Sequence, residues 1–259
     1  MALVSIITIA RDHETGLRET FASVAGQDYP NWEMLIVVGV SKDSTLETAK
    51  DFAQLNSRVR VIEQSGLGIF GAMNEGIENT RGEFTWFMNA GDKFADAHIL
   101  GIAVNEITRA KVGLVIGGYR IDGGKEWQVY SYPKKEISGF AFAFSRRGGC
   151  HQAMIFRTSN LKRLGGYDLA YSLNSDFALV LRVIESAGAL RVSEIYAAIE
   201  PGGVADQNIF TVHREKHQIR RGFFGNASSM VFLSWMWTFA AGSKIYLRRT
   251  IKLVHSIFS

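Results

Sequence analysis

The chain has very little cysteine and no long apolar run. It contains 1 Cys and 3 Pro among 259 residues. A single cysteine excludes a disulfide framework and any zinc site built from cysteines, and it fits a reducing compartment. The longest apolar candidate for a membrane segment, residues 230–242, is shorter than the roughly 18 residues that a spanning helix needs. We therefore expect a globular chain that is held together by a hydrophobic core.

Two phosphate-binding motifs are also missing. The loop after the first apolar run carries no G-x-G-x-x-G, and no G-x-x-x-x-G-K-[ST] occurs in the chain. These are the signatures of dinucleotide oxidoreductases and of P-loop nucleotidases, so neither class is supported. Residues 1–10 lack the basic leader of a signal peptide and predict a buried strand instead.

The net charge of +4 is unevenly distributed along the chain. From residue 210 onward there are eight Lys and Arg side chains against Glu215 alone, a net charge of +7. The preceding residues carry 21 basic and 24 acidic side chains, a net charge of −3. Because the basicity belongs to the last fifty residues, a basic nucleic-acid-binding domain is disfavoured, and we expect no nucleic-acid partner.

Apolar runs alternate with helical patterns through the first half of the chain. Strands that are apolar throughout and are separated by helices predict a parallel sheet covered on both faces. Ligands of such sheets bind at the carboxyl ends of the strands, so the loops after these strands are the candidate site. We expect strands at residues 3–9, 32–38, 59–63 and 84–88, and helices at 44–56 and 69–80.

The second half is less regular, and no domain boundary is evident before about residue 205. Residues 138–150 form a Gly- and Phe-rich connection. We expect strands at residues 112–119, 126–131, 152–156 and 190–199, and helices at 159–164 and 176–187.

Two loops carry residues suited to phosphate and metal chemistry. Gly66, Gly68 and Gly71 follow the third strand, where small residues and a helix N-terminus let the backbone approach an anion. The same pattern also fits a tight strand-to-helix turn. The fourth strand ends in Asn89-Ala90-Gly91-Asp92. A carboxylate at this place can hold Mg²⁺ or Mn²⁺, and it can equally cap the turn.

Eight short motifs follow one another between residues 3 and 200, among them FMNAGD at 87–92 and HQA at 151–153. In this order they resemble the family two glycosyltransferases. The eight motifs lie at residues 4–9, 23–33, 41–45, 68–77, 87–92, 151–153, 164–168 and 174–177.

The resemblance implies a GT-A fold, an α/β architecture with a Rossmann-like, mostly parallel sheet flanked by helices. A nucleotide-binding half would span about residues 1–110 and an acceptor half about 111–205. The implied activity is inverting transfer of a sugar, of the hexosyltransferase type, from a nucleotide-sugar donor. The implied acceptor is a hydroxyl of a glycan or lipid-linked molecule in cell-surface polysaccharide biosynthesis.

The resemblance also implies roles for individual residues. Asp92 would hold a divalent metal (Mg²⁺ or Mn²⁺) on the donor diphosphate, and Asp176 would be the general base. The alternatives are a helix N-cap for Asp176, a turn residue for Asp43 and a structural histidine at 151. The residues expected to bind substrate are Ile9, Ala10, Arg11, Asp43, Gly68, Asn74, Asn89 and His151.

The chain departs from the family at four positions where acids are common. Val38, Gly66, Gly71 and Gly91 stand at these places. The loss of acids at 38 and 66 removes the expected contacts to a uridine base, so the nucleobase of the donor is open. Because acidic residues are missing at these positions, an alternative function stays open: a non-catalytic subunit that binds nucleotide sugars or assists assembly at a membrane.

Residues 206–259 form a basic, aromatic tail beyond the resemblance. Apolar residues at 245, 251 and 254 alternate with Arg248, Arg249 and Lys252 and predict an amphipathic helix. Trp and Tyr suit the headgroup level of a bilayer, and Lys and Arg suit anionic lipid. We expect a cytoplasmic protein bound peripherally at the inner face of the cell membrane. The alternative is that the tail packs on the body or forms a dimer contact.

Overall fold

The computed structural model describes residues 1–64, 66, 68–122, 127–145, 149–202 and 208–225. The first half builds four parallel strands, and each agrees with its expected range to within one residue. All side chains of the second of these strands are buried, which explains why its sequence is apolar without alternation. The strands are β1 (Val4–Ala10), β2 (Trp32–Val38), β3 (Val59–Glu63) and β4 (Phe84–Phe87).

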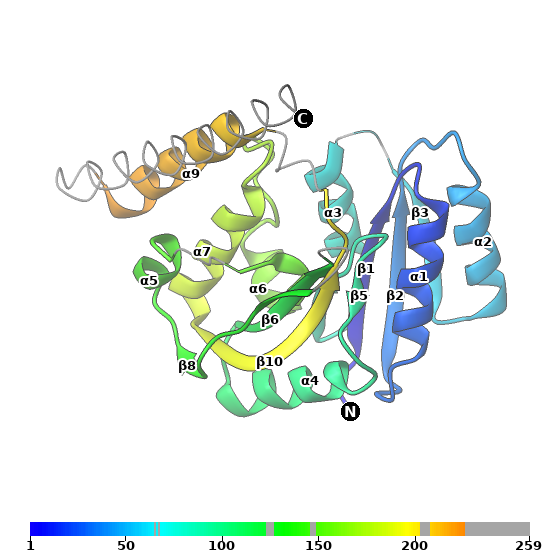
Figure 1. The fold of residues 1–259 in the computed structure, drawn as a ribbon, viewed down its shortest axis with the longest axis horizontal. Helices are drawn as coiled ribbons and strands as arrows, with labels where there is room; N and C mark the ends of the chain where they lie inside the picture. The colour runs from blue at the N-terminus through cyan, green and yellow to red at the C-terminus, as the bar shows by residue number, and fades with distance from the viewer. Residues whose placement is uncertain (65, 67, 123–126, 146–148, 203–207, 226–259) are drawn as a thin grey trace, which may run out of the picture.

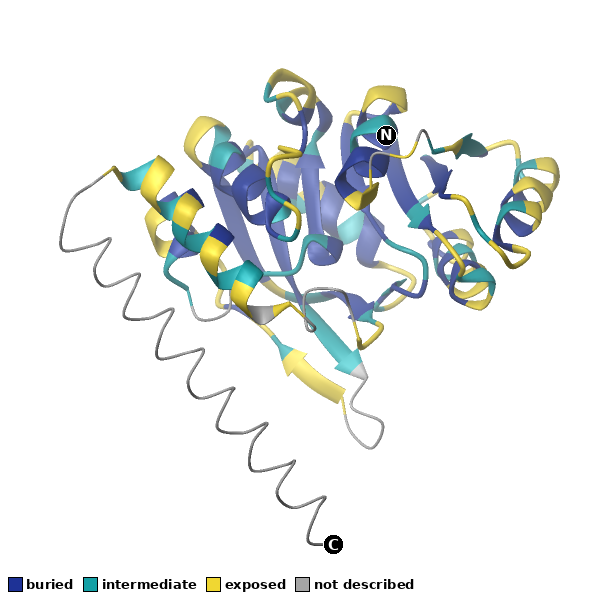
Figure 2. Ribbon diagram, turned by 90° about the horizontal axis from the view of Figure 1, so that it is seen from above, coloured by how far each residue is buried: buried dark blue, intermediate teal, exposed yellow. Residues whose placement is uncertain are grey.

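Helices cover both faces of this sheet (Figure 1). Successive residues of β1 point to opposite faces, so Ile6 joins one hydrophobic cluster and Ile7 joins the other. The cluster of Ile6 includes Leu17 and Phe52 from the first two helices, and the cluster of Ile7 includes Met73 from the third. In Figure 2 the buried strands lie between helices whose outer faces are exposed. These helices are α1 (Glu14–Ala25), α2 (Thr45–Leu55) and α3 (Gly68–Asn79).

The second half extends the same sheet with strands of both directions. Its elements are β5 (Lys93–Phe94), α4 (Ile99–Ala110), β6 (Leu114–Asp122), β7 (Trp127–Tyr130), β8 (Lys135–Glu136), α5 (Gly139–Ala143), the 3-10 turn η1 (His151–Ala153), β9 (Met154–Arg157), α6 (Thr158–Arg163), α7 (Ser175–Ala187), β10 (Ala189–Ile199) and α9 (Ile209–Phe224). The strand order is β3-β2-β1-β4-β9-β6-β10-β5, with β7 beside β6 and β8 beside β10. β9 runs antiparallel to both β4 and β6, whereas β10 is parallel to β6. The expectation of an α/β, mostly parallel sheet flanked by helices is confirmed.

Five elements of the second half were not expected: β5, α4, β8, α5 and η1. β5 and α4 lie between residues 88 and 112, where no element was assigned, and α5 lies inside the Gly- and Phe-rich connection. The sequence does carry the signal for α4, because five buried apolar side chains recur at helical spacing. They are Ile99, Leu100, Ala103, Val104 and Ile107.

The first part of the expected tail is helix α9, and it packs on the body. Ile219 of α9 is buried in the cluster that also contains Leu179 and Val183 of α7. Arg220 donates a hydrogen bond from Nε to the carbonyl oxygen of Ala143 in α5, over 2.9 Å. No helix of the described residues is long and apolar enough to cross a membrane. Residues 226–259, with the expected amphipathic helix, lie outside the described part of the chain.

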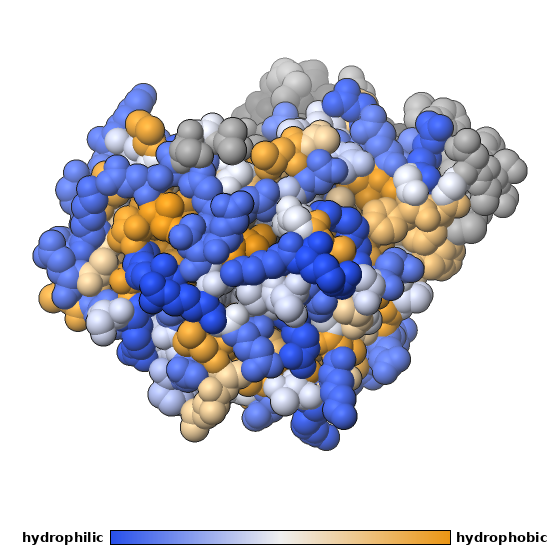
Figure 3. Space-filling model, turned by 180° about the vertical axis from the view of Figure 1, so that it is seen from behind, coloured by the Kyte–Doolittle hydropathy of each residue, from blue (hydrophilic) through white to orange (hydrophobic). Residues whose placement is uncertain are grey.

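Phenylalanines fill the contact between α5 and α9. The ring of Phe224 lies 5.9 Å from those of Phe140 and Phe144, measured between centroids. Phe140 is 49% exposed. Figure 3, which shows the molecule from behind, has a hydrophobic area on the right, the side on which α5 and α9 lie. The contact between α5 and α9 is therefore apolar, although α9 itself is rich in basic residues.

Candidate active site

The carboxyl ends of the first strands meet at one edge of the sheet. The N–H of Gly39 donates to the carbonyl of Ala10 over 2.9 Å, and the N–H of Gln64 donates to that of Val38 over 2.8 Å. On the other side of β1, the N–H of Ala90 donates to Ile9 over 3.1 Å. The loops that follow β1 to β4 therefore lie side by side, as a ligand site at the carboxyl ends of the strands requires.

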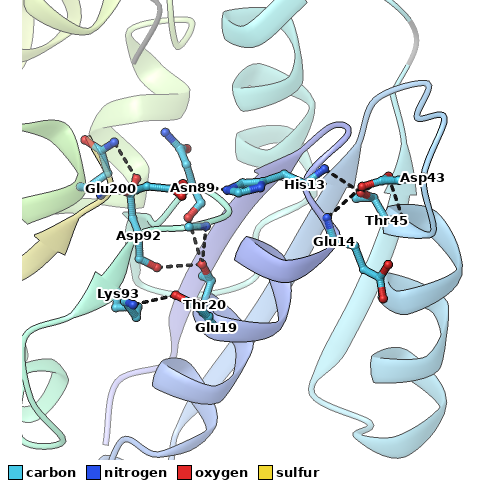
Figure 4. A network of polar contacts seen from close by, with 12 residues as sticks. His13, Glu14, Glu19, Thr20, Asp43, Thr45, Asn89, Asp92, Lys93 and Glu200 are labelled. Atoms are coloured by element: carbon cyan, nitrogen blue, oxygen red, sulfur yellow. Dashed lines mark hydrogen bonds and ion pairs between the residues drawn. The ribbon is translucent and has the colours of Figure 1, made fainter. Parts of the chain in front are cut away.

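The turn at the end of β4 is fixed by a buried hydroxyl of α1. Thr20 Oγ1 lies 2.7 Å from the carbonyl oxygen of Asp92 and 3.1 Å from that of Asn89, and it accepts the N–H of Gly91 over 3.0 Å (Figure 4). Thr20 has no exposed surface. One side chain thus sets the path of the backbone that carries Asn89 and Asp92.

The carboxylate of Asp92 is held by two donors from the second half. Gln152 Nε2 donates to Oδ2 over 2.8 Å, and the backbone N–H of Glu200 donates to Oδ1 over 3.0 Å. Asp92 is 4% exposed. Burial raises the pKa of Asp92 above its ordinary value, and the hydrogen bonds from Glu200 and Gln152 oppose that effect. The orientation of this acid is therefore set by η1 and by the end of β10.

Glu200 and His13 occupy the space beside Gly91. A Cβ at position 91 would clash with Glu200 Oε2, and φ at Gly91 is +96°. Glu200 Oε2 lies 2.7 Å from Nε2 of His13, which precedes α1 (Figure 4). The family often has an acid at position 91, and here the carboxylate of Glu200, the residue after β10, stands where that side chain would begin.

His151 connects the strand-end turn with the proposed base. Its Nδ1 lies 3.5 Å from Oδ2 of Asp176, and its Nε2 lies 3.4 Å from Nδ2 of Asn89. A neutral imidazole with its proton on Nδ1 satisfies both contacts. Gln152, the next residue, holds Asp92. The structure therefore brings Asn89, Asp92, His151 and Asp176 together, all four of which were expected from the sequence.

Asp176 is the second residue of α7 and remains accessible. Its side chain is 32% exposed, compared with 14% for His151. Burial acts to raise the pKa of Asp176, but His151, the N–H of Phe177 and Lys216 outweigh it and bring the pKa below its ordinary value. The side chain is thus an ionised carboxylate at neutral pH and can accept a proton from a bound hydroxyl.

Two of the residues expected to bind substrate have structural contacts in this fold. Asp43 accepts hydrogen bonds from the N–H of Glu14 and from both the N–H and the hydroxyl of Thr45, so it links the first turns of α1 and α2. Asn74 donates to the carbonyl of Tyr167 over 2.9 Å and accepts its N–H over 2.7 Å. These contacts agree with the turn interpretation of Asp43 and fix α3 to the segment before α7.

The other expected residues lie at the end of β1 and at the start of α3. Ile9 and Ala10 end β1, and the side chain of the following Arg11 is 74% exposed. Gly68 begins α3 with φ +74°, and its carbonyl accepts a hydrogen bond from Gln64 Nε2 over 2.6 Å. Arg11 is thus the long polar side chain of this group, and its Nε lies 4.0 Å from Oδ2 of Asp12 at the surface.

The sequence did not reveal most of the residues that surround Asn89 and Asp92: Thr20, Gln152 and the backbone N–H of Glu200 bond this turn, and His13 contacts the side chain of Glu200. Thr20, Gln152, His13 and Glu200 act on residues far away in the chain, and three of the four have no motif around them that marks a site. Gln152 is the exception, because it lies in the HQA motif beside His151. Within the described residues, no group of three His, Cys, Asp or Glu is arranged to hold a metal ion.

A mixed sheet of this order, with Asp92 in the turn after β4 and Asp176 at the start of α7, is the arrangement expected of a glycosyltransferase of the GT-A class. Residues 5–165 match the family described as Glycosyl transferase family 2. The chain belongs to this family of nucleotide-sugar glycosyltransferases.

Two bacterial glycosyltransferases are similar to this chain in sequence. It is 26% identical over 252 residues to an uncharacterized glycosyltransferase of Mycobacterium tuberculosis (strain ATCC 25618 / H37Rv), covering 95% of this chain and 90% of that protein. It is 32% identical over 95 residues to a putative teichuronic acid biosynthesis glycosyltransferase of Bacillus subtilis (strain 168), covering 36% and 37%.

The solved structures share the fold at low sequence identity. S. aureus TarS in complex with UDP superposes with a TM-score of 0.67 at 17% identity, covering 88% of this chain and 74% of TarS. A mannosyltransferase from Pyrobaculum calidifontis in complex with GDP-Man and Mn²⁺ superposes with a TM-score of 0.64 at 15% identity, covering 93% and 75%. The GT-A fold expected from the sequence is confirmed.

Proposed function

We propose that the protein transfers a hexosyl group, with inversion, from a nucleotide-sugar donor to a hydroxyl of a glycan or lipid-linked acceptor. The observation that carries the proposal is the link between Asp92 and Asp176 through the neighbouring residues His151 and Gln152. One carboxylate is buried at the sheet edge and the other is accessible at a helix start. Their environments suit different roles in one reaction.

Asp176 acts as the general base. Its carboxylate takes the proton of the acceptor hydroxyl while that oxygen attacks the anomeric carbon. The bond from the anomeric carbon to the nucleoside diphosphate breaks, and its electron pair leaves with the diphosphate. A single in-line displacement of this kind inverts the anomeric configuration. His151, 3.5 Å from Asp176, fixes the direction of the carboxylate.

Asp92 and Asn89 fit a divalent cation at the donor diphosphate. Each oxygen of Asp92 accepts one hydrogen bond and keeps a second lone pair. Asn89 Oδ1 is buried and has no hydrogen-bond partner among the described residues. Carboxylate and amide oxygens are ligands for Mg²⁺ and Mn²⁺. A bound cation would neutralise the charge that develops on the departing diphosphate.

The nucleotide lies over the loops that follow β1 and β3. Arg11 is exposed at the first of these loops, and Gly68 opens α3 at the second. The N–H groups at the start of a helix suit a phosphate. Val38 and Gly66 leave this region without the acids that the family uses near a uridine base, so we do not restrict the donor to UDP sugars.

The acceptor side extends toward a membrane surface. The Bacillus subtilis relative is named for teichuronic acid biosynthesis, which supports a role in cell-envelope glycoconjugates. The basic and aromatic residues at 230–254 suit anionic lipid, and we propose that they hold the enzyme at the inner face of the cell membrane.

A panel of nucleotide sugars tests the function. The wild-type protein is incubated with each sugar and Mn²⁺ or Mg²⁺, and both donor binding and release of the free nucleotide are measured. We expect one donor class to bind and to be turned over, with slower turnover in Asp176→Asn. Failure of every donor to bind would contradict the proposal, and binding without turnover would favour the non-catalytic alternative.

A further inference from the structure

Glu215 of α9 holds the segment that leads into α7. Its carboxylate is 5% exposed and accepts five hydrogen bonds from residues 172–174. Oε1 accepts the N–H of Ser172 over 2.9 Å and its hydroxyl over 2.8 Å. Oε2 accepts the N–H groups of Leu173 and Asn174, each over 3.0 Å, and Nδ2 of Asn174 over 3.2 Å.

These donors keep Glu215 charged. Burial acts to raise its pKa, but the bonds from Ser172, Leu173 and Asn174 bring the pKa below its ordinary value. Three successive backbone N–H groups that converge on one carboxylate form an anion-binding concavity. The carboxylate also lies at the N-terminal end of α7, where the helix dipole favours negative charge. The contact is therefore strong for a single side chain.

The clamped segment adjoins the proposed base. Asn174 is the residue that caps α7, and Asp176 follows two residues later. Asn174 is tied to α9 a second time, because its Nδ2 also donates to the carbonyl of Val212 over 3.1 Å. Lys216, the neighbour of Glu215, places its Nζ 5.4 Å from the ring centroid of Phe177. Helix α9 thus contacts the chain on both sides of Asp176.

We propose that Glu215 is a positioning residue for the transfer reaction, which fixes the first turn of α7 so that Asp176 faces His151 and the acceptor hydroxyl. The inference rests on the proposed role of Asp176 as base. It also assigns α9 to the catalytic body, although the sequence suggested that the body ends near residue 205. A displacement of about 1 Å between base and acceptor can cost about 100-fold in rate.

Three full-length variants test the inference. Glu215→Gln keeps the shape of the side chain but removes its charge and turns an NH₂ group toward backbone N–H groups. Glu215→Asp keeps the charge on a shorter stem. Arg214→Gln is the matched control, since Arg214 is the exposed neighbour on the same helix. For each protein we measure kcat, the Kd of the donor, and amide hydrogen exchange of residues 172–174.

We expect Glu215→Gln to lower kcat about 100-fold and to speed exchange of residues 172–174 about tenfold or more, with donor Kd within about twofold of wild type. Glu215→Asp should recover part of kcat, and Arg214→Gln should match wild type in all three measurements. Unchanged exchange, or fast exchange with an unchanged kcat, would overturn the inference. Equal losses in kcat and donor binding would indicate a general structural role and would also overturn it.

The exchange measurement needs no activity, so it separates this inference from the proposed function. A wild-type protein that transfers no sugar would refute the function, and with it the catalytic consequence of Glu215. The contrast in exchange between wild type and Glu215→Gln would still show whether Glu215 holds the segment.

Discussion

The imidazole of His151 lies with Nδ1 3.5 Å from Oδ2 of Asp176. His151 stands in the turn η1, and Asp176 stands in the first turn of α7. The next residue of η1, Gln152, donates to Asp92 over 2.8 Å. Two consecutive side chains therefore reach the proposed base and the proposed metal carboxylate, and a change at any of the four should affect the reaction in a different way.

Loss of the base should stop transfer without loss of the fold. Asp176→Asn keeps the size of the side chain but cannot take up the proton, so we expect a fall in kcat of about 100- to 10,000-fold. Transfer is measured at saturating donor, and the fold is checked by thermal unfolding. Asp51→Asn, at an exposed position of α2, is the control. Full activity in Asp176→Asn would remove this residue as the base.

The pH dependence of activity should respond to the positive charge of Lys216, which acts on the proposed base Asp176. The pKa of Asp176 lies below its ordinary value of 3.8, partly through Lys216, and the active form is the carboxylate. Activity is thus lost only as pH falls through that lowered pKa. Lys216→Met removes the positive charge, which raises the pKa of Asp176 and moves the acid limb to higher pH.

The profile of kcat/KM, followed from neutral pH to below pH 3.8 with the fold checked at each point, tests this expectation. Lys111→Met, an exposed lysine at the end of α4, should keep the wild-type profile. An acid limb of Lys216→Met that coincides with that of wild type would show that Lys216 does not influence the base.

Metal affinity should depend on the hydrogen bond from Gln152. Gln152→Leu leaves Oδ2 of Asp92 without its donor, and loss of such an orienting partner costs about 10- to 100-fold in metal affinity. Mn²⁺ binding is measured by electron paramagnetic resonance with nucleoside diphosphate present. Asp92→Ala should weaken binding at least as much, whereas Gln54→Ala, on the exposed face of α2, should not. An unchanged donor Kd of Asp92→Ala in Mn²⁺ would refute the metal role.

Stability should depend on the hydroxyl of Thr20. Thr20→Val keeps the shape but leaves the N–H of Gly91 and the carbonyl of Asp92 without their shared partner. A buried polar group left unpaired costs about 1–3 kcal/mol, so the free energy of unfolding should fall by about that amount in urea titrations. Thr20→Ser keeps the hydroxyl and should lose less. Equal losses would show that the hydroxyl of Thr20 contributes no more to stability than its methyl group.

Membrane binding should depend on the basic residues of the tail. Each Lys or Arg near an anionic surface is worth about 1 kcal/mol, about fivefold in affinity. We expect the double variant Arg248→Gln and Arg249→Gln to bind vesicles of anionic lipid at least about tenfold more weakly in co-sedimentation. A pair changed on the body, Arg81→Gln and Arg163→Gln, is the control. Identical binding by both pairs would assign membrane contact elsewhere or to no part of the chain.

The parallel half of the fold could be predicted because burial leaves a direct trace in the sequence. Every residue of β2 is buried, so its apolar run has no alternation and its bounds were correct. The sequence of β9 does not indicate its antiparallel direction, because its pairing with β4 and β6 depends on how the chain returns to the sheet. α4 did have a helical pattern, and a closer reading of its apolar spacing would have found it.

The candidate site, too, could be predicted from the sequence only in part. Asp92 and Asp176 could be found because they belong to short motifs in a known order. Glu200 and Glu215 could not, because their partners lie far away in the sequence: the backbone N–H of Glu200 donates to the carboxylate of Asp92, and the carboxylate of Glu215 accepts the backbone N–H of Asn174. Asn74 was expected at the nucleotide, but both of its amide atoms are engaged with the backbone of Tyr167.

The turn η1 contacts both of the carboxylates to which we assign roles in the reaction. His151 and Gln152 are adjacent, so one peptide unit joins the side chain that contacts Asp176, the proposed base, to the side chain that holds Asp92, the proposed metal carboxylate. Among the described residues, the loops after β1, β2 and β3 contribute no hydrogen bond to either of these two carboxylates. A descendant of this enzyme could therefore exchange its donor by changing those loops alone, while the spacing of its reacting groups is inherited intact.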